Sequence, residues 1–316
     1  MAIRARITKN ENAMDNTPPT MLLTPSDFND YRLIDTGGYE KLERFGRYVL
    51  SRPEPQAIWA KSLPQSSWQK MADGRFERDR GNDERGRWIV RDGMDDRWSI
   101  GYRHGGMRME MRLALTSFKH VGVFPEQAVN WRYIYDEVSA RVHDGAVSVL
   151  NLVAYTGGAS VAACAAGASV THVDSVRQVV SWARENMESS GGDGIRWIVE
   201  DARKFVLKEV RRGRKYDGII LDPPAYGRGT EGEKWVLEND LYPFMTECRR
   251  LLADDGFMIL NLYSMGFSSL LAHSLLGELF PDAPVEHGEL YLTDDYGKRL
   301  PLSVFARFSM RRKAGV

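Results

Sequence analysis

The hydrophobic pattern of the chain changes near residue 118. Before that point, short apolar and aromatic segments such as QAIWAK (56–61), RWIVRD (87–92) and RWSIGY (97–102) alternate with clusters of Gly, Asp and Asn. Segments of this length between turn-forming residues are typical of strands joined by tight turns. The pattern therefore predicts a flexible N-terminus over residues 1–21 and a smaller, mostly β domain over residues 22–118.

Residues 119–316 show a second pattern, in which short apolar runs alternate with helix-length segments such as 176–189 and 234–253. The apolar runs, most of them rich in β-branched residues, are 146–153, 169–174, 195–200, 216–222 and 256–263. This alternation indicates a parallel sheet with helices on both faces. The segment 285–310 differs, because it holds two strands around the turn DDYGK with no helix between them. We expect an α/β fold whose mostly parallel, seven-stranded sheet ends in an antiparallel hairpin.

Charge and cysteine content limit the partners. The chain has 43 basic and 43 acidic residues, so bulk charge does not indicate a polyanionic partner, and nucleic-acid contacts would have to come from local patches. The two cysteines and six histidines show no metal-binding spacing, so we predict no metal. Two separated cysteines suit a reducing cytosol. Without a membrane-length apolar run or a secretory signal, we expect a cytoplasmic protein with no membrane partner. No feature indicates an oligomeric state.

Candidate ligand residues stand where the predicted strands end, which is where open parallel sheets bind ligands. Small residues from Tyr155 to Ser160 follow the first strand, Asp174 ends the second, and Asp201 follows the third. An acid after the second strand is typical of ribose binding. Each of these features also has a purely structural explanation. The small residues are compatible with a tight strand-to-helix turn alone, and Asp174 and Asp201 are both compatible with a helix N-cap. A nicotinamide dinucleotide is disfavoured, because the turn lacks the G-x-G-x-x-G pattern that a pyrophosphate requires.

The segment IILDPPAYGRG (219–229) places an acid and two prolines directly after the fourth strand. The prolines remove two backbone donors and fix two φ angles, so the chain leaves the strand as a stiff elbow. Asp222 and the Pro223 carbonyl could then accept the N–H bonds of an amino group, while Tyr226 could stack on a flat ring. The structural alternative is a stiff turn in which Asp222 is a cap.

These motifs together resemble a known family. VLNLVAYTGGASV, VTHVD, VEDARKFV and YDGIILDPPAYGRG resemble the class I S-adenosylmethionine-dependent methyltransferases. Among these, the chain most resembles the bacterial enzymes that methylate large-subunit ribosomal RNA at cytosine C5 or guanine N7. VGVFPEQAVNWRYI (121–134) resembles the segment that precedes their first strand. The resemblance covers about residues 119 to 266 and implies a Rossmann-like methyltransferase fold with S-adenosyl-L-methionine as cofactor; the N-terminal domain shows no such resemblance.

The resemblance also implies roles for individual residues. The residues implied in cofactor binding are Asn151, Tyr155, Gly157 and Gly158 on the methionine side, Asp174 at the ribose, Asp201 and Ala202 at the adenine, and Phe124, Glu126 and Gln127 over the cofactor. Asp222, Pro223 and Tyr226 would be the catalytic residues that face the transferable methyl group. Arg228 and Trp235, which follow the elbow, could contact the substrate, although a Trp on a helix is also typical of a core.

One departure from the family concerns the acceptor atom. Cytosine-C5 enzymes use a cysteine after the fifth strand, but here that place reads LNLYSM (260–265), and Cys164 and Cys248 lie on predicted helices. We therefore expect a methyltransferase that acts on RNA, with ribosomal RNA favoured, and on a nitrogen rather than on C5. Two alternatives are open: a small-molecule or protein methyltransferase, and a non-catalytic RNA-binding assembly protein that keeps the cofactor fold.

Overall fold

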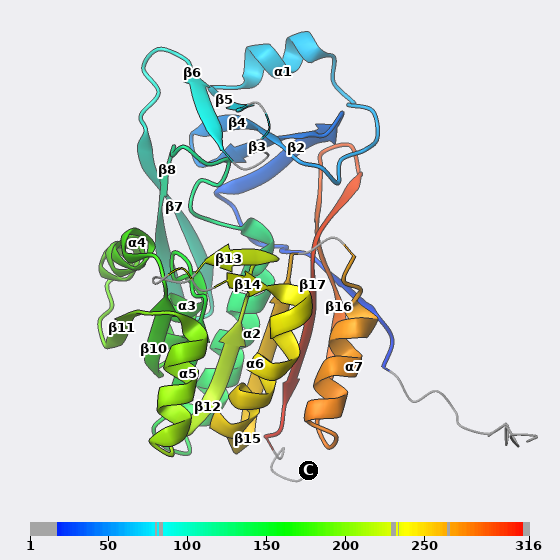
Figure 1. Cartoon of the computed structure of the whole chain (residues 1–316). Coiled ribbons are helices and arrows are strands. Elements are labelled where there is room, and N and C mark those ends of the chain that lie inside the picture. The colour runs from blue at the N-terminus through cyan, green and yellow to red at the C-terminus, as the bar shows by residue number, and fades with distance from the viewer. Residues whose placement is uncertain are drawn as a thin grey trace, which may run out of the picture.

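The computed structural model describes residues 18–79, 81, 85–228, 232, 234–263 and 266–311, except for the side chain of Arg228. Figure 1 shows an α/β part below and a β-rich part above it, with the hairpin of β16 and β17 reaching from the lower part to the upper one. Most of the predicted flexible N-terminus, residues 1–21, lies outside the described residues.

The α/β part is built on one eight-stranded sheet, in the order β1-β16-β17-β15-β12-β9-β10-β11. Its strands are β1 (Met21–Leu23), β9 (Ser148–Leu152), β10 (Ser169–Asp174), β11 (Ile195–Val199), β12 (Tyr216–Leu221), β15 (Leu252–Leu262), β16 (Glu286–Thr293) and β17 (Arg299–Ser309). The strands from β9 to β12 and β15 pair in parallel, whereas β17 pairs antiparallel with both β15 and β16. The predicted α/β fold is thus confirmed, with one strand more than expected because β1 pairs with the edge of β16.

Helices cover both faces of this sheet, because successive strand residues point to opposite sides. The helices are α2 (Ala128–Val142), α3 (Gly158–Ala165), α4 (Arg177–Ser189), α5 (Ala202–Arg211), α6 (Leu237–Leu251) and α7 (Ser269–Leu279). Val149 belongs to the hydrophobic cluster that holds residues of α2 and α3, while its neighbour Leu150 belongs to the cluster with residues of α5 to α7. Residues 234–236, which we predicted to start a helix, instead form strand β14 (Lys234–Val236) paired with β13 (Tyr226–Arg228).

The β-rich part contains a five-stranded sheet, a separate hairpin and one short helix. These elements are β2 (Tyr31–Gly37), β3 (Glu40–Phe45), β4 (Tyr48–Pro53), β5 (Gly74–Arg78), β6 (Gly86–Val90), the hairpin β7 (Arg97–His104) and β8 (Met107–Ala114), and α1 (Gln65–Met71). The predicted strands in RWIVRD and RWSIGY are confirmed by β6 and β7. QAIWAK is not a strand, because the carbonyls of Ala57 and Trp59 accept from the turn at Gly38 and Tyr39 instead of pairing in a sheet.

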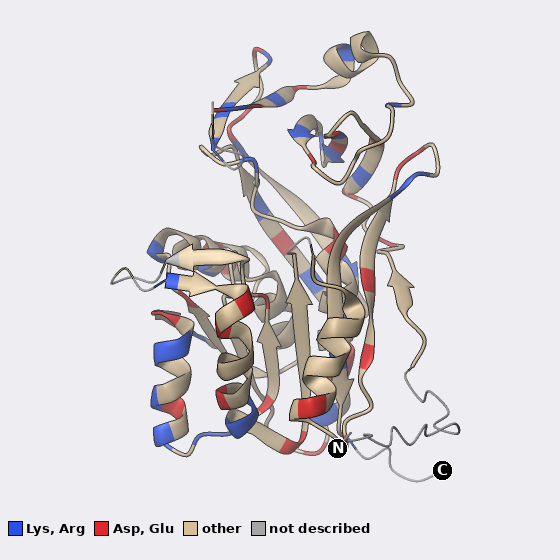
Figure 2. Ribbon diagram, turned by 45° about the vertical axis from the view of Figure 1, so that its right-hand side comes forward, with Lys and Arg blue, Asp and Glu red and all other residues tan. Residues whose placement is uncertain are grey.

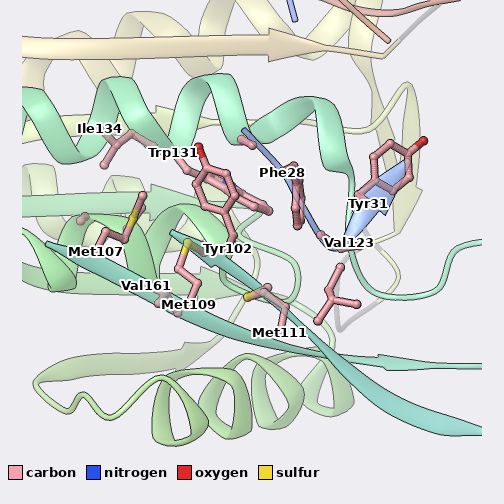
Figure 3. Close-up of a cluster of buried hydrophobic side chains, with 14 of the residues drawn as sticks. Phe28, Tyr31, Tyr102, Met107, Met109, Met111, Val123, Trp131, Ile134 and Val161 are labelled. Atoms are coloured by element: carbon pink, nitrogen blue, oxygen red, sulfur yellow. The ribbon is translucent and has the colours of Figure 1, made fainter. Parts of the chain in front are cut away.

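The two parts share hydrophobic core across residue 118. In Figure 3, Tyr102, Met107, Met109 and Met111 of the β7–β8 hairpin point toward Trp131 and other residues of α2 and α3. Burial of these long apolar side chains removes a large area from water and fixes the hairpin on the α/β part. The domain boundary at residue 118 stays a prediction.

A second contact joins the parts at the tip of the β16–β17 hairpin. Lys298 Nζ lies 2.8 Å from Asp35 Oδ1, and Thr36 Oγ1 donates to Asp294 Oδ2 at 2.7 Å. Burial raises the pKa of Asp35, but hydrogen bonds from Lys298, from the Leu63 and Ser62 amides and from Trp68 outweigh it and hold the pKa at about 2. The terminal hairpin thus connects the sheet of the α/β part to β2 through buried charge.

Candidate active site

A cleft opens at the carboxyl ends of β9, β12 and β15, where the sheet predicts a ligand site. Its empty volume, with the open mouth included, is about 570 Å³. The lining includes seven of the predicted site residues: Phe124, Gln127, Asn151, Tyr155, Gly157, Gly158 and Asp222. Residues far apart in sequence therefore meet at one place, as the strand-end argument predicted.

The turn between β9 and α3 forms one wall of the cleft. Val153 and Tyr155 have positive φ angles of 55° and 49°, which is costly for residues with a Cβ and occurs mostly at functional sites. A Cβ on Gly157 would lie 2.9 Å from the Ala183 Cβ, and a Cβ on Gly158 would lie 2.7 Å from the Trp131 ring. The glycine pair therefore lets α2 and α4 pack closely around the start of α3, in addition to any contact with a ligand.

Asn151, at the end of β9, is held by buried polar neighbours. Its Nδ2 donates to Ser160 Oγ at 2.9 Å, and Ser160 Oγ lies 3.0 Å from His172 Nδ1. Burial lowers the pKa of His172 to about 3, so the imidazole is neutral at physiological pH. Asn151 thus has a fixed orientation at the cleft wall.

The two acids predicted for the nucleoside end make backbone contacts. Asp174 accepts from the amides of Tyr155 at 3.0 Å and Val176 at 2.9 Å, and burial raises its pKa while these bonds partly offset the rise. Asp201 is the N-cap of α5 and accepts from the Lys204 amide at 3.0 Å, and Ala202 begins that helix. The N-cap alternative is therefore realised for Asp201 but not for Asp174, because the N-cap of α4 is Val176. The ribose and adenine roles of the two acids stay predictions.

The segment before β9 contributes a chain of hydrogen bonds that the sequence did not reveal. Phe124 and Gln127 line the cleft, but Glu126 is buried and accepts from the hydroxyl of Tyr263 at 2.8 Å. That hydroxyl accepts from Gln127 Nε2 at 2.9 Å, and Asn130 Nδ2 donates to Gln127 Oε1 at 2.8 Å. Burial raises the pKa of both Glu126 and Tyr263.

Tyr263, Asn130 and Asn261 are among the site residues that sequence reasoning missed. Tyr263 stands in the LNLYSM segment, which we considered only for its missing cysteine. Asn130 is three residues after Gln127, a spacing that places two side chains on one face of a helix. The rings of Phe124 and Tyr263 lie 5.1 Å apart and those of Phe124 and Tyr155 5.5 Å apart, so half-buried aromatic residues gather beside the cleft.

The elbow after β12 places a carboxyl group in the cleft. Asp222 is partly buried, and Asn261 Nδ2 lies 3.3 Å from its Oδ1. Burial raises the pKa of Asp222 to about 7, although the hydrogen bond from Asn261 lowers it. Pro223 is buried, which keeps the acid fixed in direction.

Beyond the prolines, the chain forms the β13–β14 ribbon. Tyr226 is 55% exposed on β13. Arg228 lies on the same strand, but its side chain is outside the described part of the chain. Trp235 of β14 is 9% exposed, packs on Phe244, and donates to the Pro224 carbonyl at 2.6 Å. This burial fits the core alternative, in which the ring holds the elbow in place; contact of Trp235 with a substrate stays a prediction.

Cysteines and metal ligands are the other groups to place. Cys248 is buried in α6, Cys164 Sγ donates to the Asp193 carbonyl at 2.9 Å, and neither residue lines the cleft. Within the described ranges no group of three His, Cys, Asp or Glu side chains could hold a metal ion. None of the helices in the described part of the chain combines the length and hydrophobicity of a membrane span.

Comparison with known proteins gives independent information on this cleft. The model of the S-adenosylmethionine-dependent methyltransferase family matches residues 72–287. A solved S-adenosylmethionine-dependent methyltransferase from Agrobacterium tumefaciens is 39% identical with a TM-score of 0.84, and the match covers 92% of this chain and 94% of that one. SMU.776, solved in complex with SAH, is 19% identical with a TM-score of 0.69 over 90% of this chain and 76% of its own, which supports the fold.

Curated relatives match a shorter region. The ribosomal RNA large subunit methyltransferase K/L of Shewanella frigidimarina is 29% identical over 154 residues, which are 48% of this chain and 21% of that protein. The protein of the same name from Vibrio cholerae is 33% identical over 116 residues, which are 35% of this chain and 16% of that protein. The match thus spans about a fifth of the length of these relatives.

The cleft fits the cofactor of this family. Helix α3 begins at Gly157 without a side-chain cap, so amides of its first turn can receive an anion such as the methionine carboxylate. The Oδ1 atom of Asn130, a buried residue of α2 in the lining of the cleft, has no hydrogen-bond partner within the described structure and can receive a ligand donor. By its fold, its cleft and its match to the family model, the chain belongs to the S-adenosylmethionine-dependent methyltransferases.

Proposed function

We propose that this methyltransferase modifies a base in RNA, with ribosomal RNA as the favoured substrate and a nitrogen as the acceptor atom. The observation that carries the proposal is the position of the Asp222 carboxyl, which lines the cofactor cleft beside Asn261 at the carboxyl ends of β12 and β15. A carboxylate there can accept the N–H bonds of a conjugated amino group.

The chain's own residues then have to position the acceptor and take its proton. S-adenosylmethionine supplies an already activated methyl group, so orientation accounts for much of the rate. A pKa of about 7 lets Asp222 exist as a carboxylate at neutral pH and still accept a proton. Pro223 restricts the backbone beside Asp222 and so fixes the orientation of its carboxylate. The half-buried rings of Phe124, Tyr155 and Tyr263 offer apolar faces for a flat heterocycle. Tyr226, which is exposed on β13, is proposed to cover the acceptor from outside.

A nitrogen acceptor is favoured because the described lining of the cleft lacks the cysteine thiol that methylation at cytosine C5 requires. Attack on the cytosine ring requires a thiolate, and the chain has two cysteines. Both are outside the cleft, and burial raises the pKa of each thiol. Raised pKa values disfavour the nucleophilic thiolate form.

RNA is favoured as the substrate class by the names of the curated relatives, which describe ribosomal RNA methyltransferases. Basic surface adds little to this. Arginines gather at the ends of α5 and α6, where the chain turns into the starts of β12 and β15. This is the end of the sheet opposite the β13–β14 ribbon (Figure 1). In Figure 2, basic and acidic segments are interspersed over both parts of the chain. Recognition would then rest on the shape and polar groups of the cleft.

The cofactor roles of Asp174, Asp201 and Ala202 are part of the same proposal. Asp174 keeps lone pairs beyond its two backbone bonds and can accept from ribose hydroxyls. Asp201 and Ala202 follow the neighbouring strand, β11, and can meet the adenine. Arg228 is proposed to contact the RNA from β13.

The test is transfer of tritiated methyl groups from S-adenosylmethionine to three separate pools. These are unmodified large-subunit ribosomal RNA transcripts, total ribosomal protein, and a small-molecule extract. We expect label in the RNA pool with the wild type and a loss of at least about a hundredfold with Asp222→Asn. Label that enters only protein or small molecules would refute the RNA assignment.

A further inference from the structure

One polar atom in the cleft lacks a partner. Asn130 is 2% exposed, and its Nδ2 donates to Gln127 Oε1 at 2.8 Å. Its Oδ1 has no hydrogen-bond partner among the residues that the structure describes, although the residue lines the cleft. Because an unpaired buried amide oxygen is costly to folding, such an atom in a binding cleft indicates that the ligand brings a donor to it.

A chain of hydrogen bonds determines which end of the Asn130 amide is free. The Tyr263 hydroxyl donates to Glu126 Oε1 at 2.8 Å and therefore accepts from Gln127 Nε2, at 2.9 Å. Gln127 then presents its Oε1 to Asn130, so Asn130 must turn Nδ2 toward Gln127 and leave Oδ1 as the free atom. The carboxylate of Glu126, three hydrogen bonds away, thus makes Asn130 an acceptor rather than a donor.

The position of Asn130 selects among the donors of the cofactor. S-adenosylmethionine carries donors on its α-ammonium, its ribose hydroxyls and its adenine amino group. Asn130 shares the cleft with Asn151 and the Gly157–Gly158 turn, whereas Asp174 and Asp201, the residues for ribose and adenine, are outside its lining. The uncapped start of α3 in the same cleft suits the α-carboxylate, which belongs to the same end of the cofactor as the ammonium.

We propose that Asn130 Oδ1 accepts a hydrogen bond from the α-ammonium of S-adenosylmethionine, and that Gln127, Tyr263 and Glu126 act as positioning residues that hold the amide in this orientation. The cofactor end would then be recognised by a helix that precedes the first central strand. This inference rests on the cofactor and is independent of the acceptor that is methylated.

The test compares ligands that differ at the methionine end, by isothermal titration of the full-length protein. S-adenosylhomocysteine keeps the α-ammonium, its desamino analogue lacks only that group, and methylthioadenosine lacks the whole amino-acid end. For Asn130→Leu, which removes the acceptor and keeps the branching of the side chain at Cγ, we expect S-adenosylhomocysteine to bind at least about tenfold more weakly. The affinity for methylthioadenosine should change by less than about twofold, because this ligand lacks the ammonium group that Asn130 would contact.

Two comparisons separate recognition from a general structural role. On the wild type, the desamino analogue should bind more weakly than S-adenosylhomocysteine by the same factor by which Asn130→Leu weakens S-adenosylhomocysteine. The affinity of the desamino analogue should not fall further on Asn130→Leu. Tyr263→Phe, which breaks the chain but keeps the ring, should weaken S-adenosylhomocysteine and not methylthioadenosine. Unchanged S-adenosylhomocysteine affinity in Asn130→Leu, or an equal loss for all three ligands, would overturn the proposal. If Asn130→Leu does not fold, the affinities of S-adenosylhomocysteine and its desamino analogue are compared on the wild type and on Tyr263→Phe. Equal affinities of the two ligands on the wild type would then overturn the proposal.

Discussion

Replacement of Asp222 by Asn should make the protein more stable while it removes activity. The acid sits partly buried in the cleft, where burial raises its pKa from 3.8 to about 7. Its only charge-stabilising contact among the described residues is the 3.3 Å hydrogen bond from Asn261 Nδ2, which the oxygen of an Asn side chain can also accept. The substitution therefore removes a costly charge and keeps the shape and the hydrogen bond.

The magnitude and the sign follow from linkage between protonation and folding. A pKa of 3.8 in the unfolded chain and about 7 in the folded one corresponds to about 4 kcal/mol. Because the side chain is only partly buried, solvent reduces this, and we expect about 2 kcal/mol. At a pH well below 3.8, the pKa of Asp222 in the unfolded chain, both states are protonated and no difference remains. As the pH rises to about 7 the unfolded state ionises first, so the wild type loses stability, and above that the penalty is complete.

The assay is urea denaturation of the cofactor-free protein at about pH 4.5 and about pH 8, with Asp282→Asn as the matched control at an exposed acid. Asp222→Asn should exceed the wild type by about 2 kcal/mol at the higher pH and by much less at the lower one. Asp282→Asn should change neither value by more than about 0.5 kcal/mol. A variant that is no more stable than the wild type at about pH 8 would contradict a buried, pKa-shifted acid at the elbow.

Other predictions concern the walls of the site and the contact between the two parts. Gly158→Ala places a Cβ 2.7 Å from the Trp131 ring; the variant should lose about 1–3 kcal/mol in urea denaturation and bind S-adenosylhomocysteine more weakly. Lys298→Met leaves the buried Asp35 without its cation and should cost about 3 kcal/mol at neutral pH. Since the pKa of Asp35 is depressed to about 2, its stabilisation is present above about pH 4 and is lost toward pH 2 in acid titration of the wild type. Trp235→Phe removes the hydrogen bond to the elbow carbonyl and should lower kcat while titration shows unchanged cofactor affinity.

The strands of the α/β part were predictable because each is a short apolar run buried on both faces. The sequence pattern placed β10 at its observed bounds and the other central strands within a few residues. Strand ends then brought Asn151, Gly157 and Asp222 together without any knowledge of the fold, since parallel strands end at one edge. β1 was not predictable, because three residues that pair with a distant edge leave no periodic signal.

The parts of the site that escaped prediction depend on long-range contacts. Tyr263 meets Glu126 across 137 positions in the chain, and no local pattern marks such a pair. Trp235 looked like a helical residue beside the substrate, but its indole N–H finds the Pro224 carbonyl and draws 234–236 into a strand. Tertiary hydrogen bonds therefore decided these positions against local propensity.

We propose above that the Asp222 elbow presents a base nitrogen of RNA to the cofactor. The most direct measurement is mass spectrometry of nucleosides from an unmodified large-subunit ribosomal RNA transcript, after incubation with the protein and S-adenosylmethionine that carries a deuterated methyl group. We expect a deuterated N-methyl nucleoside that is absent with Asp222→Asn. A C5-methylated cytosine, or methylation that Asp222→Asn leaves unchanged, would contradict it.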